Sequence, residues 1–132
     1  MAHPLEGKVR EAYAAFGRGD VDGYLRHCTR DFYFNVPGRS AVSGSFRGKE
    51  GLDQLFRRVM EISAGTFQEE VQDVLANDQH AIVLARHRFE RGGKAKEYLT
   101  AHVYEVREGK LGECWEQPRD QVQFDAAWGQ LR

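Results

Sequence analysis

Apolar residues in the first half of the chain recur at helical spacing, whereas those in the second half alternate with polar residues. Spacings of three and four residues place side chains on one face of an α-helix, and alternation places them on one face of a strand. The pattern therefore predicts a run of helices followed by a run of strands. The predicted helices cover residues 4–16, a short segment capped by Asp20, and residues 49–63; the predicted strands cover residues 31–36, 66–75, 80–91, 94–107 and 110–118; residues 38–48 are predicted to form a loop.

Residues that favour turns separate these elements. Glycine accepts the left-handed backbone conformation that ends helices and closes tight hairpins, so Gly17 and Gly19 end the first helix. The pairs Gly92-Gly93 and Glu108-Gly109 are predicted to close two hairpins. Asp120 can cap a C-terminal helix, on which one face carries Phe124, Ala127, Trp128 and Leu131.

The order of the elements indicates the α+β class, because helices come first and most strands follow. We expect a cone-shaped, curved and mainly antiparallel sheet with three N-terminal helices and a short C-terminal helix. The 132 residues suit a single domain. A long twisted sheet that is covered by helices on one face curls, and its open end is a natural apolar pocket.

Composition and charge exclude several kinds of partner. The net charge of −1 offers no basic surface for nucleic acid or for an anionic membrane. No apolar run approaches the roughly 20 residues of a membrane span, and the first residues lack the apolar core of a signal peptide. We therefore expect a cytoplasmic protein. The two cysteines, Cys28 and Cys114, match no metal or redox motif.

Three segments resemble the nuclear transport factor 2 superfamily, in its SnoaL-like and ketosteroid-isomerase-related branch. They are residues 12–38 (AYAAFGRGDVDGYLRHCTRDFYFNVPG), 44–56 (GSFRGKEGLDQLF) and 102–121 (HVYEVREGKLGECWEQPRDQ). The resemblance implies a cone-shaped fold, a pocket inside the cone and a homodimer formed through the back of the sheet. It implies no single activity, because the superfamily contains isomerases, cyclases, dehydratases, epoxide hydrolases and non-catalytic binding modules.

Ketosteroid isomerases use a tyrosine on the first helix, an aspartate base on the first strand and a protonated aspartic acid on a later strand. By resemblance, these roles fall on Ala12, Val36 and Ala101, none of which can donate or abstract a proton. A shift of one residue would bring Tyr13 to the tyrosine position but would turn its side chain by about 100° around the helix. We therefore expect no steroid isomerase activity on this scaffold.

The hairpin closed by Glu108-Gly109 determines which residues share a face of the sheet. A two-residue loop without irregularity places Glu116 opposite Ala101. One face then carries Leu99, Ala101, Val103, Cys114 and Glu116, and the other carries Thr100, His102, Tyr104 and Trp115. By resemblance, the face with Ala101 lines the pocket, and the face with His102 is the back of the sheet.

Glu116 is the first candidate for catalysis. A carboxylate among apolar side chains is partly desolvated, which raises its pKa toward values that suit acid–base work. SnoaL-like cyclases resemble the chain here, with an acidic residue after a tryptophan near the end of the strand. A structural ion pair with Arg119 or another arginine is the alternative.

His87 is the second catalytic candidate, and its direction depends on the loop at Gly92-Gly93. A three-residue loop places His87 on the pocket side beside Ala101, whereas a two-residue loop places Leu84 and Arg86 there. The apolar residues that alternate with His87 favour the first arrangement.

Residues expected to contact the ligand are Tyr13, Phe34, Asn35, Val36, Phe56, Leu99, Ala101 and Val103. No metal or other cofactor is expected, because the histidines on the strands lack the close spacing of a zinc site. The predicted function is the binding of a small hydrophobic molecule, with isomerisation, cyclisation, dehydration or hydrolysis by acid–base catalysis. A non-catalytic ligand-binding or dimerisation module is the alternative. Converging polar groups in the pocket would favour the enzyme.

Overall fold

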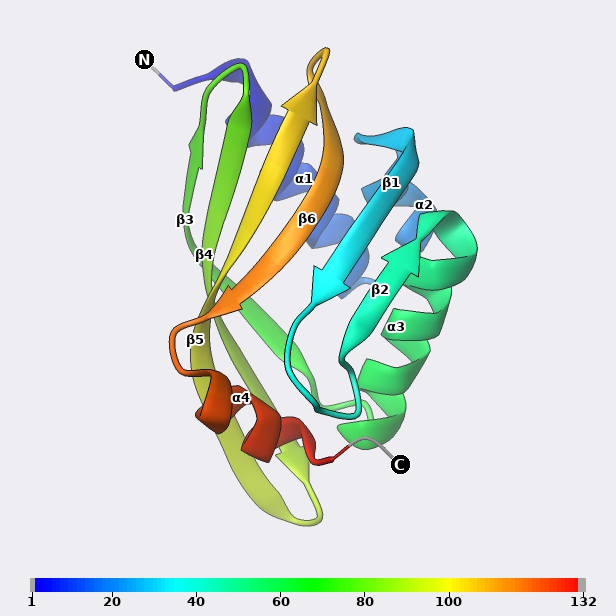
Figure 1. Cartoon of the computed structure of the whole chain (residues 1–132), viewed down its shortest axis with the longest axis vertical. Helices are drawn as coiled ribbons and strands as arrows, with labels where there is room; N and C mark the ends of the chain where they lie inside the picture. The colour runs from blue at the N-terminus through cyan, green and yellow to red at the C-terminus, as the bar shows by residue number, and fades with distance from the viewer. Residues whose placement is uncertain (1, 131–132) are drawn as a thin grey trace.

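A computed structural model describes residues 2–130, and it places four helices against a curved six-stranded sheet (Figure 1). The helices are α1 (Pro4–Gly17), α2 (Val21–Leu25), α3 (Gly48–Ile62) and α4 (Gln121–Trp128). The strands are β1 (Cys28–Val36), β2 (Gly44–Arg47), β3 (Gln68–Ala76), β4 (His80–Arg91), β5 (Lys94–Arg107) and β6 (Lys110–Pro118). The α+β class predicted from the sequence is confirmed. Leu131, assigned above to the C-terminal helix, lies outside the described residues.

The sheet has the strand order β2-β1-β6-β5-β4-β3, and every neighbouring pair is antiparallel except β1 with β6. In Figure 1, β5 and β6 run across the middle of the molecule and α1 lies behind them. Helix α3 packs beside β1 and β2, and α4 packs against β5 and β6. The sheet therefore has an inner face, which is turned toward the helices, and an outer face. Among residues 2–130, no helix is long and apolar enough to cross a membrane.

Local hydrogen bonds explain where the first helices begin. The N–H of Leu5 donates to His3 Nδ1 and the N–H of His3 donates to Glu6 Oε2, each at 3.1 Å, so that the start of α1 is capped reciprocally. The Asp20 carboxylate accepts from the N–H of Gly23 (2.9 Å) and caps α2, as predicted.

Strand β2 corrects the sequence prediction, because it lies within residues 38–48, which were assigned to a loop. Its four residues pair antiparallel with the end of β1. Only Phe46 of this edge strand is buried, so the alternation that marks a strand is too short to be visible in the sequence.

Both predicted hairpins close with two-residue loops. Both loop residues have positive φ in each case: 59° and 77° at Gly92-Gly93, and 52° and 77° at Glu108-Gly109. This geometry matches the right-handed twist of the flanking strands. The three-residue loop favoured for the β4–β5 hairpin is therefore wrong, since Arg91 pairs directly with Lys94.

A β-bulge shifts the register between β5 and β6. Val106 pairs with Leu111, but Glu105 pairs with Glu113, so Gly112 is an extra residue on β6. Beyond the bulge, every partner differs by one from the register predicted without it. His102 consequently lies opposite Glu116 on the inner face.

Three predicted pocket residues are displaced by this shift. Leu99, Ala101 and Val103 alternate with the inward-facing residues of β5 and lie on the outer face of the sheet. Their prediction as ligand contacts is wrong, because a slip of one residue exchanges the two faces of a strand.

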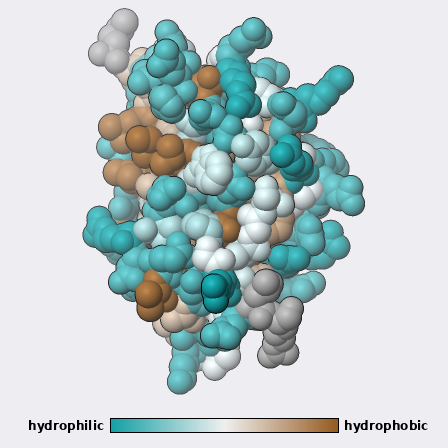
Figure 2. All heavy atoms as spheres, viewed as in Figure 1, coloured by the Kyte–Doolittle hydropathy of each residue, from teal (hydrophilic) through white to brown (hydrophobic). Residues whose placement is uncertain are grey.

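The outer face carries a row of apolar side chains across four strands. Leu75, Ile82, Val103 and Trp115 pair in register from β3 to β6. Leu75 is 50% exposed and Trp115 is 45% exposed. Figure 2 views this side of the molecule, where brown hydrophobic residues gather over β3 to β5 among polar ones.

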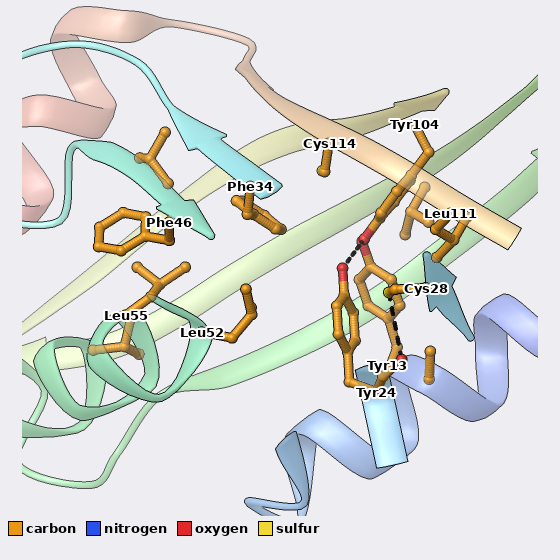
Figure 3. Packing of buried hydrophobic residues seen from close by; sticks show 14 of the residues in the cluster. Tyr13, Tyr24, Cys28, Phe34, Phe46, Leu52, Leu55, Tyr104, Leu111 and Cys114 are labelled. Carbon is orange, nitrogen blue, oxygen red and sulfur yellow. Dashed lines mark hydrogen bonds between the residues drawn. The ribbon is translucent and has the colours of Figure 1, made fainter. Parts of the chain in front are cut away.

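The core lies between the inner face and the helices. Figure 3 shows Tyr13 of α1 and Tyr24 of α2 pointing toward Tyr104 of β5, with Leu111 and Cys114 of β6 close by. Tyr104 and Leu111 are fully buried. The tyrosine hydroxyls satisfy one another, which allows polar atoms to remain within an apolar core.

We predict that Leu111→Ala lowers the free energy of unfolding by about 2–5 kcal/mol, because it leaves a cavity beside the bulge. Leu75→Ala is the matched control, since its half-exposed side chain on β3 should cost less than about 1 kcal/mol. Urea unfolding followed by circular dichroism measures both. Equal losses in the two variants would contradict the placement of Leu111 in the core.

Candidate active site

A cavity lies between the inner face of the sheet and the helices. It contains about 560 Å³ of space that no atom fills, including the part open to solvent. The lining residues are Tyr13, Phe16, Tyr24, Phe34, Val36, Val42, Leu52, Leu55, Val59, Phe67, Glu69, His87, Tyr98, His102, Glu116, Phe124 and Trp128. Apolar and aromatic side chains therefore dominate, and a few polar groups interrupt them, as is typical of small-molecule sites.

Four titratable side chains converge at one end of this cavity, one from each of four neighbouring strands. His102 Nε2 lies 3.1 Å from Glu116 Oε2, and His87 Nε2 lies 2.6 Å from Glu69 Oε2. The two pairs also approach each other, with His87 Nδ1 3.9 Å from Glu116 Oε2 and His102 Nδ1 4.0 Å from Glu69 Oε2. His87, His102 and Glu116 are each at most 5% exposed. We call these four residues the acid–base cluster.

The strand register explains why the four side chains meet. His87 pairs with Tyr98 and His102 pairs with Val83, so the two histidines lie diagonally across the pair formed by Ala85 and Thr100. The small side chain of Ala85 leaves room between them, and their ring centroids are 5.5 Å apart. The Thr100 hydroxyl donates to Glu116 Oε2 at 3.0 Å and holds the carboxylate in place.

A chain of tyrosine hydroxyls leads to His102. Tyr24 contacts Tyr104 at 2.6 Å, Tyr104 contacts Tyr13 at 2.5 Å, and Tyr13 contacts His102 Nδ1 at 2.5 Å. An ionised carboxylate only accepts hydrogen bonds, so His102 Nε2 carries the hydrogen that is donated to Glu116. In neutral His102, Nδ1 then accepts from Tyr13, which accepts from Tyr104, which accepts from Tyr24. Every hydrogen in this chain points toward Glu116.

A second chain orients His87. The indole N–H of Trp128, which can only donate, lies 2.7 Å from the hydroxyl of Tyr98, and that hydroxyl lies 2.9 Å from His87 Nδ1. Tyr98 therefore accepts from Trp128 and donates to Nδ1 of neutral His87. His87 Nε2 donates to Glu69, so these hydrogens also point toward a carboxylate.

Opposing effects determine the pKa of the Glu116 carboxyl. Burial raises it, but the imidazoles of His102 and His87 and the hydroxyl of Thr100 stabilise the ionised form more strongly, so the pKa lies below its ordinary value. Glu69 behaves alike: burial raises its pKa, and His87 and His102 lower it below the ordinary value. The raised pKa predicted for Glu116 is wrong, because the predicted register placed His102, which lowers this pKa most, on the opposite face of the sheet.

The pKa of His102 shifts in the opposite direction. Burial lowers it, but the negative charges of Glu116 and Glu69 outweigh burial and raise the pKa above its ordinary value. The cluster therefore favours ionised carboxylates together with a readily protonated imidazole.

Some predicted site residues line the cavity and others do not. Tyr13, Phe34, Val36, His87 and Glu116 line it, which agrees with the predicted placement. Asn35 does not, because it alternates with Phe34 and Val36 on β1 and so lies on the outer face.

Phe56 is also absent from the cavity wall. It packs edge-on against Phe16, with ring centroids 5.3 Å apart, and Phe16 lines the cavity in its place. Phe56 therefore supports the wall from behind.

His87 faces the cavity although the loop predicted for its hairpin is wrong. The two-residue loop places Leu84 beside Ala101, as the alternative register required. Ala101 itself lies on the outer face, so Leu84 and Arg86 share that face and His87 faces inward. The error in the length of the β4–β5 loop and the error in the β5–β6 register are each one residue, and together they leave His87 on the inner face.

Sequence reasoning missed Glu69, His102, Tyr98 and Trp128 as cavity residues. The alternation of apolar residues on β4 was enough to predict that His87 faces inward. The position of His102 could not be predicted, because the bulge shifts the register between β5 and β6. The two residues on either side of Glu69 in the sequence, Gln68 and Glu70, are exposed. The burial of Glu69 therefore depends on the helix that packs against β3.

Glu69, His87 and His102 also have the composition of a metal site. One ligand atom from each lies within 4.8 Å of the others. In this arrangement the atoms are hydrogen-bonded instead, with Glu69 bound to His87 at 2.6 Å and Tyr13 bound to His102 Nδ1 at 2.5 Å. A metal ion bound by these three atoms would replace both hydrogen bonds.

Comparison with known proteins identifies the family. The model of the SnoaL-like domain matches residues 9–113. The chain belongs to the SnoaL-like family. Uncharacterised proteins of Mycobacterium bovis and Mycobacterium tuberculosis are each 30% identical to this SnoaL-like chain over 121 residues, which cover 91% of it and 92% of the relative.

Solved structures support the same fold. Bal32a, from a soil-derived mobile gene cassette, has a TM-score of 0.86 and 29% identity, covering 95% of this chain and 96% of its own. TerC, crystallised with polyporic acid, has a TM-score of 0.82 and 19% identity, covering 95% and 98%. A protein of unknown function with a cystatin-like fold from Xanthomonas campestris has a TM-score of 0.81 and 23% identity, covering 98% and 100%. The last two likenesses concern the fold alone.

The shifted pKa values predict a bell-shaped effect of Glu116→Gln on stability. The lowered pKa of Glu116 stabilises the fold above about pH 4.3, its unfolded value, and this contribution is lost as the pH falls through the folded value. The raised pKa of His102 stabilises the fold below about pH 6.5 and is lost as the pH rises through the folded value. The loss of stability, about 1–3 kcal/mol, should therefore be largest between those two pH values.

Urea unfolding at a series of pH values measures this difference. Glu61→Gln, at an exposed position of α3, is the control and should show a small effect at every pH. A loss that is independent of pH in Glu116→Gln would contradict the assigned charge states.

Proposed function

We propose that this SnoaL-like chain binds a small, largely apolar organic molecule in its cavity and abstracts a proton from it without a cofactor. One observation carries the proposal: two carboxylates and two imidazoles converge at one end of a cavity that is otherwise apolar. Such convergence favours an enzyme over a passive binding module, because buried titratable groups with shifted pKa values cluster at functional sites.

Glu116 is the proposed general base. Its Oε2 accepts from Thr100 and His102, which leaves Oε1 for the ligand. The lowered pKa keeps the carboxylate ionised at neutral pH, so the base is ready before the ligand binds. His102 holds the carboxylate by its Nε2–H, and the pair formed by His87 and Glu69 is a second proton-transfer group at the same end of the cavity.

Proton abstraction of this kind serves isomerisation, cyclisation, dehydration or hydrolysis. Steroid isomerisation is not expected, because that reaction needs hydrogen-bond donors aimed at the ligand's oxygen. The Tyr13 hydroxyl, which could fill this role, is engaged by His102 and Tyr104. Ala101, which takes the place of the second acid by resemblance, faces away from the cavity.

A neutral aromatic carbon acid tests the base. We expect the chain to accelerate the opening of 5-nitrobenzisoxazole, in which a base removes the ring C–H and the N–O bond breaks to give a nitrophenolate nitrile. Glu116→Gln should lose at least about 100-fold of this rate, because the amide keeps the shape of the side chain and cannot take the proton. The product is followed by its absorbance.

Glu113→Gln is the matched control for this assay. Glu113 lies three residues earlier on the same strand but faces outward, where it accepts from Tyr33, Arg107 and Trp115. Its replacement should leave the rate unchanged. Equal rates in the wild type and Glu116→Gln would refute the assignment of the base.

We further propose that the outer face mediates a homodimer. The row of Leu75, Ile82, Val103 and Trp115 leaves apolar side chains exposed on the side of the sheet that α1 does not cover. Monomers seldom expose contiguous apolar patches larger than a few hundred Å². Pairing of two copies through this face would remove the row from water.

Light scattering at micromolar concentration should give the mass of a dimer. Trp115→Glu should shift the equilibrium toward the monomer, because it places a charge at the β6 end of the apolar row, where the interface would bury it. Glu108→Gln, in the exposed β5–β6 turn, is the control and should remain dimeric. A monomeric wild type would refute the proposed interface.

A further inference from the structure

The polar atoms that line the cavity fall into two unequal groups. Among the described residues that line the cavity, three tyrosines, two histidines, one tryptophan and two glutamates supply all of the polar side chains. The first six can donate hydrogen bonds, whereas the ionised glutamates can only accept them. The donors and acceptors that are available to a ligand are those that do not already form hydrogen bonds within the protein.

The donors are used within the protein. Trp128 donates to Tyr98, Tyr98 to His87, and His87 to Glu69. The hydroxyls of the other chain donate in sequence toward His102, which donates to Glu116. With both imidazoles neutral, no donor along these two chains is left over for a ligand.

Two acceptors, in contrast, are left over. All hydrogen bonds between described residues and these carboxylates involve Oε2 of Glu69 and Oε2 of Glu116. The Oε1 atoms accept no hydrogen bond from the described residues. Because both side chains line the cavity, their free oxygens present negative charge to whatever enters it.

At the cavity wall, the positive charge of a protonated His102 is already paired with Glu116 and Glu69. Neither lysine nor arginine is among the described residues that line the cavity. The rest of the wall is aliphatic or aromatic, with Phe16, Phe34, Phe67 and Trp128 offering ring faces or edges. An anionic ligand would therefore meet carboxylate oxygens without a lysine or arginine to compensate its charge.

We infer that the substrate is a largely apolar, ring-containing molecule that carries hydroxyl or amino hydrogens, which it donates to the free oxygens of Glu69 and Glu116. The inference deepens the proposed function and rests on it, since it names the class of molecule that enters the same cavity. In this inference the site acts as a hydrogen-bond acceptor and the ligand as the donor. A carboxylate ligand fits it poorly, because its charge is repelled by those of Glu69 and Glu116.

Protonation of His102 changes this pattern at one place only. Nδ1 would then donate to Tyr13, and the tyrosine hydrogens would reverse toward Tyr24, whose hydroxyl lies at the far end of the chain. The free oxygens of Glu69 and Glu116 are not part of that reversal. The preference for a donating ligand at these oxygens therefore holds in both states of His102.

Three ligands of one shape test the inference: 2-naphthol, 2-methylnaphthalene and 2-naphthoate. Calorimetric titration at pH 7 should give a dissociation constant for 2-naphthol at least about 10-fold lower than for 2-methylnaphthalene, because only the hydroxyl can donate to a carboxylate. 2-Naphthoate, an anion, should bind more weakly than both. This comparison uses the wild-type chain and requires no variant.

The preference for 2-naphthol over 2-methylnaphthalene should shrink toward unity in the double variant Glu69→Gln/Glu116→Gln and persist in Glu113→Gln. Equal binding of the two neutral ligands by the wild type would overturn the inference and leave the proposed function standing. Tighter binding of 2-naphthoate would overturn it as well. Binding of none of the three would refute both the inference and the proposed use of the cavity.

Discussion

The bulge at Gly112 is the constraint on which the site depends. One extra residue on β6 moves Glu116 from a position opposite Ala101 to a position opposite His102. Carboxylate and imidazole then share the inner face, where Thr100 and Glu69 lie within reach. Without the shift, the histidine would lie on the outer face and the carboxylate would remain buried without a partner, which is a costly state for a charged group. A single backbone irregularity therefore both creates the acid–base pair and makes its burial tolerable.

Charge compensation then organises the rest of the cavity. Two buried carboxylates need hydrogen-bond donors, and the two chains of hydrogen bonds that end at His102 and His87 supply these donors from two sides. One chain begins on α2 and crosses α1, and the other begins on α4, so helices that are distant in sequence are tied to the same four strands. The result is a polar end within an apolar cavity. Because the protein itself uses the donors, Oε1 of Glu69 and Oε1 of Glu116 are the side-chain polar atoms of the described cavity wall that carry no hydrogen bond.

The membership of the SnoaL-like family accounts for the scaffold but not for this arrangement. By resemblance, the positions of the isomerase acid and base hold Ala101 and Val36, and the titratable groups that face the cavity come from neighbouring positions and from β3 and β4. On the inner face of the sheet, each side chain can contact the side chains of neighbouring positions on the adjacent strands. Acid–base groups can therefore occupy different positions on this face while still facing one cavity.

The sequence alone determined the elements and their order, except for the short edge strand β2. Period-two alternation identified β4, β5 and β6, and the Asp20 cap and the Glu108-Gly109 turn are local features that depend on a few adjacent residues. The tertiary structure alone decided the faces near the bulge, the burial of Glu69 and the direction of the pKa shift at Glu116. The physical reason is that a one-residue irregularity leaves the alternation of each strand intact while exchanging which partner it meets. Alternation is a property of one strand, whereas register, burial and charge compensation are properties of the strands and helices that pack together.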